Sequence, residues 1–249
     1  MSTVNFDNVS LKFNKPTNKK NTIKEGIIKF ILNFGKNYYK YDTHDVLRDI
    51  NFKIIDGDRV VIIGQNGAGK STLLRLITGI YKPTSGEVKI EGSITSLIEV
   101  GAGMNPELTG RENIILSGLI SGFNSKELRA REQEIIDFAD IGDFIDVPMK
   151  YYSTGMCYRL SFSLALLVRP DILVVDELFA GGDLNFIEKS TKRVEELKND
   201  SSIFISVTHD LNYAKTFFNK IIYIKNNKIV YFGDDIAGCL LKYQNESLH

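Results

Sequence analysis

The stretch Gly64-Gln65-Asn66-Gly67-Ala68-Gly69-Lys70-Ser71-Thr72 has the residue spacing of a phosphate-binding loop. It follows the β-branched run Arg59-Val60-Val61-Ile62-Ile63, typical of a strand buried on both faces, and precedes a helix predicted over about residues 70–79. Glycines let a backbone wrap around a phosphate so that its N–H groups point inward, and a helix N-terminus adds partial positive charge. We therefore expect Lys70 to reach the β- and γ-phosphates and Ser71 to offer a hydroxyl to Mg²⁺. A chance glycine-rich turn is the alternative, which the flanking strand and helix disfavour.

Two other predicted strands also end in polar residues. Ile172-Leu173-Val174-Val175 runs into Asp176 and Glu177, and Ile203-Phe204-Ile205-Ser206-Val207 is soon followed by His209. Ligands of α/β proteins bind at the carboxyl ends of strands, so we expect Asp176 to hold Mg²⁺ and Glu177 to polarise an attacking water. Taken singly, a charged turn and a structural histidine are the alternatives. Three strands that deliver polar groups to one edge favour a functional site.

The segment Tyr152-Ser153-Thr154-Gly155-Met156-Cys157-Tyr158-Arg159-Leu160 predicts a capped helix start, with the helix continuing to about Val168. A helix N-terminus with Ser153 and Gly155 exposed can bind an anion. The chain already contains a phosphate loop, so we expect this second anion site to complete a phosphate site on another copy of the chain. For this segment alone, a plain helix start is the alternative.

Composition excludes several classes of protein. The 249 residues hold 31 basic and 31 acidic side chains, so no overall basicity favours nucleic acid as a partner. Two cysteines are too few for a disulfide scaffold or a four-cysteine zinc site, and fit a reducing compartment. We see no secretion signal and no apolar run of membrane-spanning length, and expect a soluble, cytoplasmic chain.

The order of predicted elements indicates a single domain over residues 1–249. Strands that alternate with helices predict a parallel sheet covered on both sides, and residues 100–168 read as an inserted helical lobe. Residues 15–40 read as a basic amphipathic insertion, since Lys12 to Lys40 contain eight lysines against one acid, Glu25. Apolar residues recur there at spacings of three and four. The insertion is either a surface helix packed on the sheet or an element that meets anionic lipid.

Taken in order from about Val4 to Phe232, these motifs resemble the ATP-binding cassette ATPases, the nucleotide-binding subunits of ABC transporters. The resemblance implies an α/β P-loop NTPase fold with a mixed sheet core, an antiparallel β lobe and an inserted helical lobe. It implies ATP and Mg²⁺ as ligands, Glu177 as general base and His209 as sensor of the γ-phosphate. It also implies roles for residues outside the phosphate loop: adenine stacking by Phe13, contact with the nucleotide of a partner by Ser153 and Gly155, subunit bridging by Asp183, and Mg²⁺ coupling by Glu99, which stands where glutamine is usual.

Within that family, three segments resemble bacterial exporters of O-antigen, capsule and teichoic acid. They are residues 97–103, residues 106–113, and residues 141–145 leading to Tyr152. The resemblance implies a head-to-tail homodimer that sandwiches ATP, integral membrane permease subunits as partners and a lipid-linked glycan as cargo. The protein would be peripheral, on the cytoplasmic face of the bacterial inner membrane. The alternatives are a soluble cassette ATPase acting on ribosomes or DNA, and a nucleotide-binding regulator without catalysis.

Overall fold

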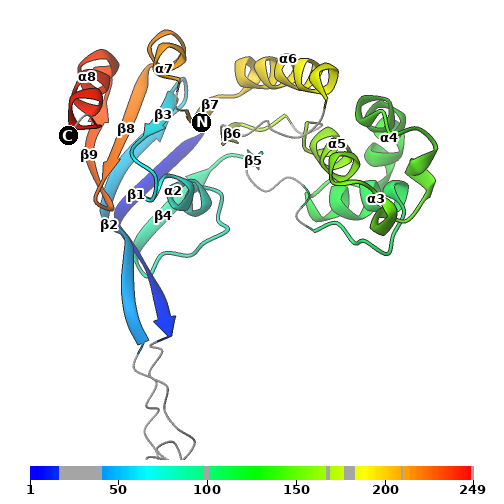
Figure 1. Ribbon diagram of the computed structural model, residues 1–249, viewed down its shortest axis with the longest axis horizontal. Helices are drawn as coiled ribbons and strands as arrows, with labels where there is room; N and C mark the ends of the chain where they lie inside the picture. The colour runs from blue at the N-terminus through cyan, green and yellow to red at the C-terminus, as the bar shows by residue number, and fades with distance from the viewer. Residues whose placement is uncertain are drawn as a thin grey trace, which may run out of the picture.

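A computed structural model of the chain describes residues 1–16, 41–97, 101, 103–166, 169–176, 183–208 and 210–247. Most of the predicted basic insertion lies outside these residues, as do Glu99, Glu177 and His209. Within the described part, the strands form two sheets that lie close together in Figure 1. The smaller sheet is antiparallel, in the order β2-β1-β4, and consists of β1 (Thr3–Pro16), β2 (Tyr41–Ile55) and β4 (Ser85–Glu91).

The larger sheet has the order β5-β6-β7-β3-β8-β9. All neighbouring pairs are parallel except β8 and β9, which form an antiparallel hairpin. The predicted mixed sheet core and antiparallel β lobe are thereby confirmed. The strands of the larger sheet are β5 (Ile94–Ser96), β6 (Ile172–Val175), β7 (Ile203–Val207), β3 (Arg59–Ile63), β8 (Lys220–Lys225) and β9 (Lys228–Gly233).

The central strand β3 is buried on both faces. Val60 and Ile62 belong to one apolar core and Val61 and Ile63 to another, because successive side chains of a strand point to opposite faces. The first core lies between the two sheets and includes α2 (Lys70–Ile77). The second core lies on the other face, under α6 (Leu184–Asp200), α7 (Leu211–Phe217) and α8 (Ile236–Ser247). The strand that leads into the phosphate loop is therefore held from both sides.

A helical lobe is formed by α3 (Gly110–Ile120), α4 (Ser125–Ala139), two short 3₁₀ turns, η1 (Gly142–Asp146) and η2 (Met149–Tyr151), and α5 (Thr154–Ala165). These elements pack around an apolar cluster of their own. In Figure 1 the lobe lies to one side of the sheets, and the start of α6 faces it. The helix that the sequence predicts to about Val168 ends earlier in the structure. Its last helical residue is Ala165, and Leu166 is its C-cap.

A buried asparagine orders the entrance to this lobe. The side chain of Asn113 is fully buried, and its amide nitrogen donates to the carbonyl oxygens of Asn105, Leu108 and Thr109 at 2.9, 3.2 and 2.9 Å. Its amide oxygen accepts from the backbone N–H of Asn105 at 2.7 Å. One side chain thus satisfies four backbone groups of the loop that precedes α3.

Among the described helices, none is long and apolar enough to cross a membrane.

Candidate functional site

Residues 64–72, the phosphate loop, join the end of β3 to the start of α2. A Cβ atom at Gly64 would run into the carbonyl oxygen of Ile224 on β8, and one at Gly69 would lie 2.8 Å from Cδ2 of Leu47. Gly69 also has a φ of +109°, a value that favours glycine. The loop therefore passes so close to neighbouring elements that these two positions exclude a side chain.

The lysine of the loop is buried, with a relative exposure of 9%. Its ammonium nitrogen Nζ donates to the carbonyl oxygen of Gly64 at 2.7 Å and to that of Gln65 at 3.1 Å. These bonds place the positive charge of Lys70 inside the curve of the loop, where an anion would sit.

The outer part of the loop is open. Gln65, Asn66 and Gly67 are exposed, as is Ser71 in the first turn of α2, while Thr72 is half-buried. Ala68 is buried, and its N–H donates to the carbonyl oxygen of Gln65 at 3.1 Å, which closes a turn. A ligand could therefore reach the loop from the side of the exposed residues.

Strand pairing brings the ends of β6 and β7 to the same edge of the sheet as the phosphate loop. Ile62 pairs with Val207 on β7, and Ser206 pairs in turn with Val175 on β6. Because β3, β6 and β7 are parallel, the phosphate loop, Asp176 and Thr208 all emerge at the carboxyl edge. The structure thus collects at one edge the three strand ends singled out in the sequence.

The oxygen ligands at this edge fit Mg²⁺. Asp176 supplies a half-exposed carboxylate after β6, and Ser71 supplies a hydroxyl on α2. Mg²⁺ prefers oxygen ligands and keeps several waters, so one carboxylate, one hydroxyl and phosphate oxygens suit it. In the described part of the chain no three His, Cys, Asp or Glu side chains cluster as an all-protein metal cage. The predicted metal ligand Glu99 lies outside the described residues.

Thr208, which the sequence reasoning did not select, stands at the end of β7. It is buried, and its hydroxyl oxygen accepts from the N–H of Asp210 at 3.0 Å. Asp210 in turn caps α7 by accepting from the N–H groups of Asn212 and Tyr213 at 2.9 and 3.0 Å. In the sequence, the place of this threonine directly after an apolar strand could have marked it as a residue at the strand end. One hydrogen bond thus spans position 209, and the cap of α7 follows it; His209 itself lies outside the described residues.

Ser153 caps α5, as its place in the sequence predicts. Its hydroxyl accepts from the N–H of Met156 at 3.2 Å, and both Ser153 and Thr154 are exposed while Gly155 is half-buried. Figure 1 places α5 in the helical lobe, apart from α2 and the phosphate loop. Within one chain the structure does not bring Ser153 to the loop.

Asp183 and Phe13 make contacts inside the chain. One oxygen of Asp183 caps α6 by accepting from the N–H of Phe186 at 2.9 Å, and the other accepts from Arg159 at 3.1 Å. Phe13 is 42% exposed and packs edge-to-face on Tyr81, with ring centroids 5.4 Å apart. Tyr81 follows α2, and its N–H donates to the carbonyl oxygen of Arg75 at 3.0 Å. Phe13 therefore contacts the residues beyond the end of α2.

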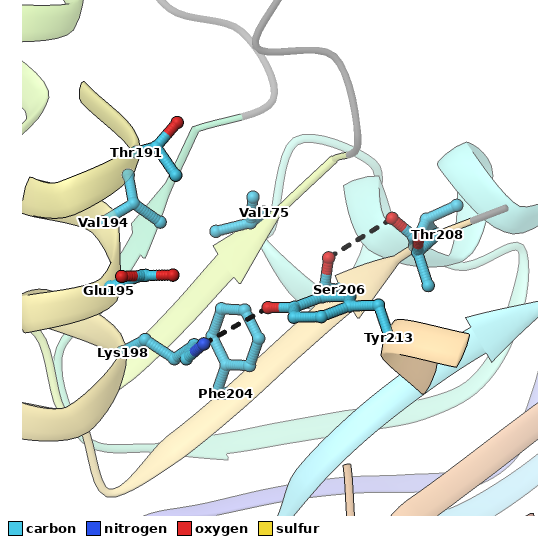
Figure 2. A pocket seen from close by; sticks show the side chains of 10 residues that line it. Val175, Thr191, Val194, Glu195, Lys198, Phe204, Ser206, Thr208 and Tyr213 are labelled. Atoms are coloured by element: carbon cyan, nitrogen blue, oxygen red, sulfur yellow. Dashed lines mark hydrogen bonds between the residues drawn. The ribbon is translucent and has the colours of Figure 1, made fainter. Parts of the chain in front are cut away.

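A cavity of about 230 Å³ opens beside the ends of β6 and β7, between α6 and α7 (Figure 2). Lys198 of α6 extends into it, and its Nζ atom donates to the hydroxyl of Tyr213 at 3.3 Å. Burial lowers the pKa of Lys198 and raises that of Tyr213. Nothing in the sequence distinguished Lys198 from a surface lysine, because its burial depends on how α6 packs against β7.

Comparison with known proteins gives consistent matches. The ABC transporter family profile matches residues 47–180. The chain is 50% identical over 165 residues to the O-antigen export system ATP-binding protein RfbB of Myxococcus xanthus, a match that covers 66% of this chain and 38% of that protein. It is 41% identical over 183 residues to RfbB of Klebsiella pneumoniae, covering 74% of each. It is 40% identical over 226 residues to the teichoic acids export ATP-binding protein TagH of Listeria monocytogenes, covering 91% of this chain and 65% of that protein.

A solved structure supports the fold. The dimeric ATP-binding cassette MJ0796, in a post-hydrolysis state bound to ADP and Pi, superposes with a TM-score of 0.65 at 24% identity. The superposition covers 93% of this chain and 98% of that chain.

Proposed function

The chain belongs to the ABC transporter family, and we propose that it is the ATP-binding and ATP-hydrolysing subunit of a transporter that exports a lipid-linked polysaccharide. The observation that carries the proposal is the phosphate loop at the carboxyl end of β3, beside the strand ends that lead to Asp176 and Thr208. Its curve holds the Lys70 ammonium, and Gln65, Asn66 and Gly67 are exposed on its outer side. This arrangement supplies N–H donors and positive charge for phosphate oxygens.

Hydrolysis is an in-line attack of water on the γ-phosphorus of ATP. Lys70 holds the β- and γ-phosphate oxygens, which develop charge as the bond to the leaving ADP breaks. Glu177, which follows Asp176, orients the attacking water and takes its proton. When bound, Mg²⁺ neutralises phosphate charge; Ser71 and Asp176 are the residues that would hold it. His209 senses the γ-phosphate and Phe13 stacks on the adenine, and Glu99 would be the residue that links a bound Mg²⁺ to the transporter.

Two copies of the chain associate head to tail. Ser153 and Gly155 at the start of α5 then close the site formed by the phosphate loop of the other copy, with Asp183 at the bridge between the subunits. The exposure of Ser153 and its separation from the loop of its own chain support this arrangement, because its helix end is free to meet another molecule. Closing and reopening of the dimer drive integral membrane permease subunits.

The cargo is a glycan of O-antigen, capsule or teichoic acid type, and the subunit works at the cytoplasmic face of the inner membrane. The names of the relatives, which refer to O-antigen export and teichoic acids export, support this cargo class over a soluble ATPase acting on ribosomes or DNA. The first of these relatives is matched over 38% of its length, so the cargo is assigned by similarity of the ATP-binding part.

The proposed chemistry is tested with Glu177→Gln in the full chain. This variant should bind an ATP analogue as the wild type does and lose steady-state phosphate release, because its amide cannot accept the proton of water. Normal turnover in Glu177→Gln would remove the assignment of the base. Deleting the gene in its own host tests the cargo: an undecaprenyl-linked polymer should build up inside the cell, and unchanged polymer at the surface would argue against export.

A further inference from the structure

The cavity beside the ends of β6 and β7 surrounds a buried cation. Lys198, on α6, is 4% exposed, and its Nζ atom lies 3.0 Å from the centroid of the Phe217 ring and 5.4 Å from that of Tyr213. The centroid of Phe204, on β7, is 5.9 Å away. Figure 2 shows Lys198 extending from α6 towards Tyr213, with Phe204 beside it. The faces of these rings attract the ammonium and hold it in place.

Within the described part of the chain, the charge of Lys198 has no counter-ion in contact with it. An ammonium has three N–H donors. One of them donates to the hydroxyl of Tyr213 at 3.3 Å, and no described carboxylate forms an ion pair with Nζ. Burial lowers the pKa of Lys198, and the nearby carboxylate of Glu195 opposes this shift only in part. Since a cation buried without a counter-ion is costly, an anion that reached Nζ would be stabilised there.

The walls of the cavity suit an apolar group of limited size. Val175, Val194 and Val207 line it and are buried, and Ser206 and Thr208 add hydroxyl groups. An apolar cavity of about 150 Å³ can hold benzene. The volume of about 230 Å³ found here therefore admits one aromatic ring, or a branched chain of similar size, together with a short polar group.

The rim of the cavity carries an opposing charge. Thr191 and Glu195 line it from α6 and are exposed to solvent. The Glu195 carboxylate would repel an anion, but water and salt strongly screen an exposed charge. The Lys198 ammonium is enclosed by protein, where the lower dielectric makes a charge act more strongly. The balance of charge in the cavity therefore favours an anion.

We propose that this cavity binds a small monocarboxylic acid with an aromatic or branched apolar body, whose carboxylate pairs with the ammonium of Lys198. The apolar body packs between the valine side chains and the Phe204 ring. The cavity lies at the carboxyl ends of two parallel strands, where ligands of α/β folds bind. None of its described lining residues belongs to the phosphate loop, so the inference goes beyond the proposed function.

The test is calorimetric titration of the full chain with benzoate, and with benzyl alcohol as a neutral ligand that has the same ring. Benzoate should bind at one saturable site, more tightly than benzyl alcohol. Lys198→Met keeps an unbranched apolar side chain and removes the charge. It should weaken benzoate binding about 10- to 100-fold, the usual effect of losing a hydrogen bond to a charged group, and change benzyl alcohol binding less than about twofold. Lys192→Met, which removes an exposed lysine of the same helix, is the matched control and should bind both ligands normally.

A second variant tests the sign of the charge without altering the buried lysine. Glu195→Gln removes the negative charge at the rim and should raise benzoate affinity about two- to fivefold. A lower affinity in this variant would mean that the cavity prefers a cation, and would overturn the inference. So would the absence of saturable benzoate binding, equal affinities for the two ligands, or unchanged benzoate affinity in Lys198→Met. Displacement of benzoate by an ATP analogue would place the acid at the phosphate loop and would overturn it too. None of these outcomes measures hydrolysis, so the proposed function is tested separately.

Discussion

The Nζ atom of Lys70 lies 2.7 Å from the carbonyl oxygen of Gly64, six positions earlier in the chain. The loop thereby holds its own cation at its centre. A phosphate that enters the curve meets an ammonium already in place, so little side-chain entropy is lost on binding.

Lys70→Ala should weaken ATP binding by about 10- to 100-fold, since a hydrogen bond to a charged group contributes about 1.5–3 kcal/mol. The measurement is titration with a fluorescent ATP analogue. Lys82→Ala, which removes an exposed lysine after α2, serves as the matched control and should bind normally. Equal affinities for Lys70→Ala and the wild type would mean that the ammonium does not contact phosphate.

Gly64→Ala should destabilise the fold by about 1–3 kcal/mol, the usual cost of forcing a group into a packed site. The added methyl group would meet the backbone of β8, which cannot move away as a flexible side chain could. Gly67→Ala is the control, because no atom lies within 4 Å of a Cβ there, although its φ of +80° still costs about 1 kcal/mol. Urea unfolding compares the two, and a larger loss at Gly67 would contradict this account.

Much of the fold follows from local sequence. The apolar run of β3 predicts burial on both faces, and the spacing of residues 64–72 predicts a loop between strand and helix; the structure has both. Strand β1 was not predicted. Its buried positions alternate through Val4 and Phe6 and resume at Val9, because Asn8 adopts a φ of +49° and the pairing register shifts there. An interrupted period of two conceals a strand from pattern analysis.

The candidate site, like the fold, could be predicted from the sequence only in part. The residues of the phosphate loop follow one another in the sequence, and so do the two acids after β6, so each motif could be recognised from its spacing. The contacts of Arg159 were not foreseen, because its partners Asp140 and Asp183 become neighbours only once α4, α5 and α6 have packed. Ser153 illustrates a third case: the sequence predicts its cap, and its distance from the loop of its own chain comes only from the arrangement of the lobes.

Asn113→Ala should destabilise the protein by about 2–4 kcal/mol. The change leaves the N–H of Asn105 without its acceptor and removes one of two donors from each of three carbonyls of the loop before α3, and it also leaves a cavity where the fully buried side chain packed. Asn124→Ser is the control, because serine can take over the cap of α4 at a cost of only a few tenths of a kcal/mol. Chemical denaturation measures both variants, and similar midpoints would show that the loop finds other partners.

Cys239 of α8 should be almost unreactive in the folded chain. It is 5% exposed, and burial raises its pKa from 9.0 to about 11. Since the thiolate is the nucleophile, near pH 8 only about one thiol in a thousand would be ionised. A disulfide reagent should therefore modify Cys157, which is less buried, well before Cys239. Peptide mapping after partial labelling distinguishes them, and equal labelling of folded chain at both sites would refute the burial argument.

The same shift in the pKa of Cys239 makes stability depend on pH. The folded state keeps the proton to a pKa of about 11, while the unfolded thiol loses it near its ordinary value of 9.0, so the unfolded state binds fewer protons between these values. The free energy of unfolding should therefore be undiminished below about pH 9 and fall above it, by at most about 1.4 kcal/mol per pH unit from this group. Cys239→Ala lowers stability at every pH by opening a cavity, but its curve should fall less steeply above pH 9. Unfolding curves at a series of pH values give both slopes, and parallel curves would mean that the thiol ionises equally in the two states.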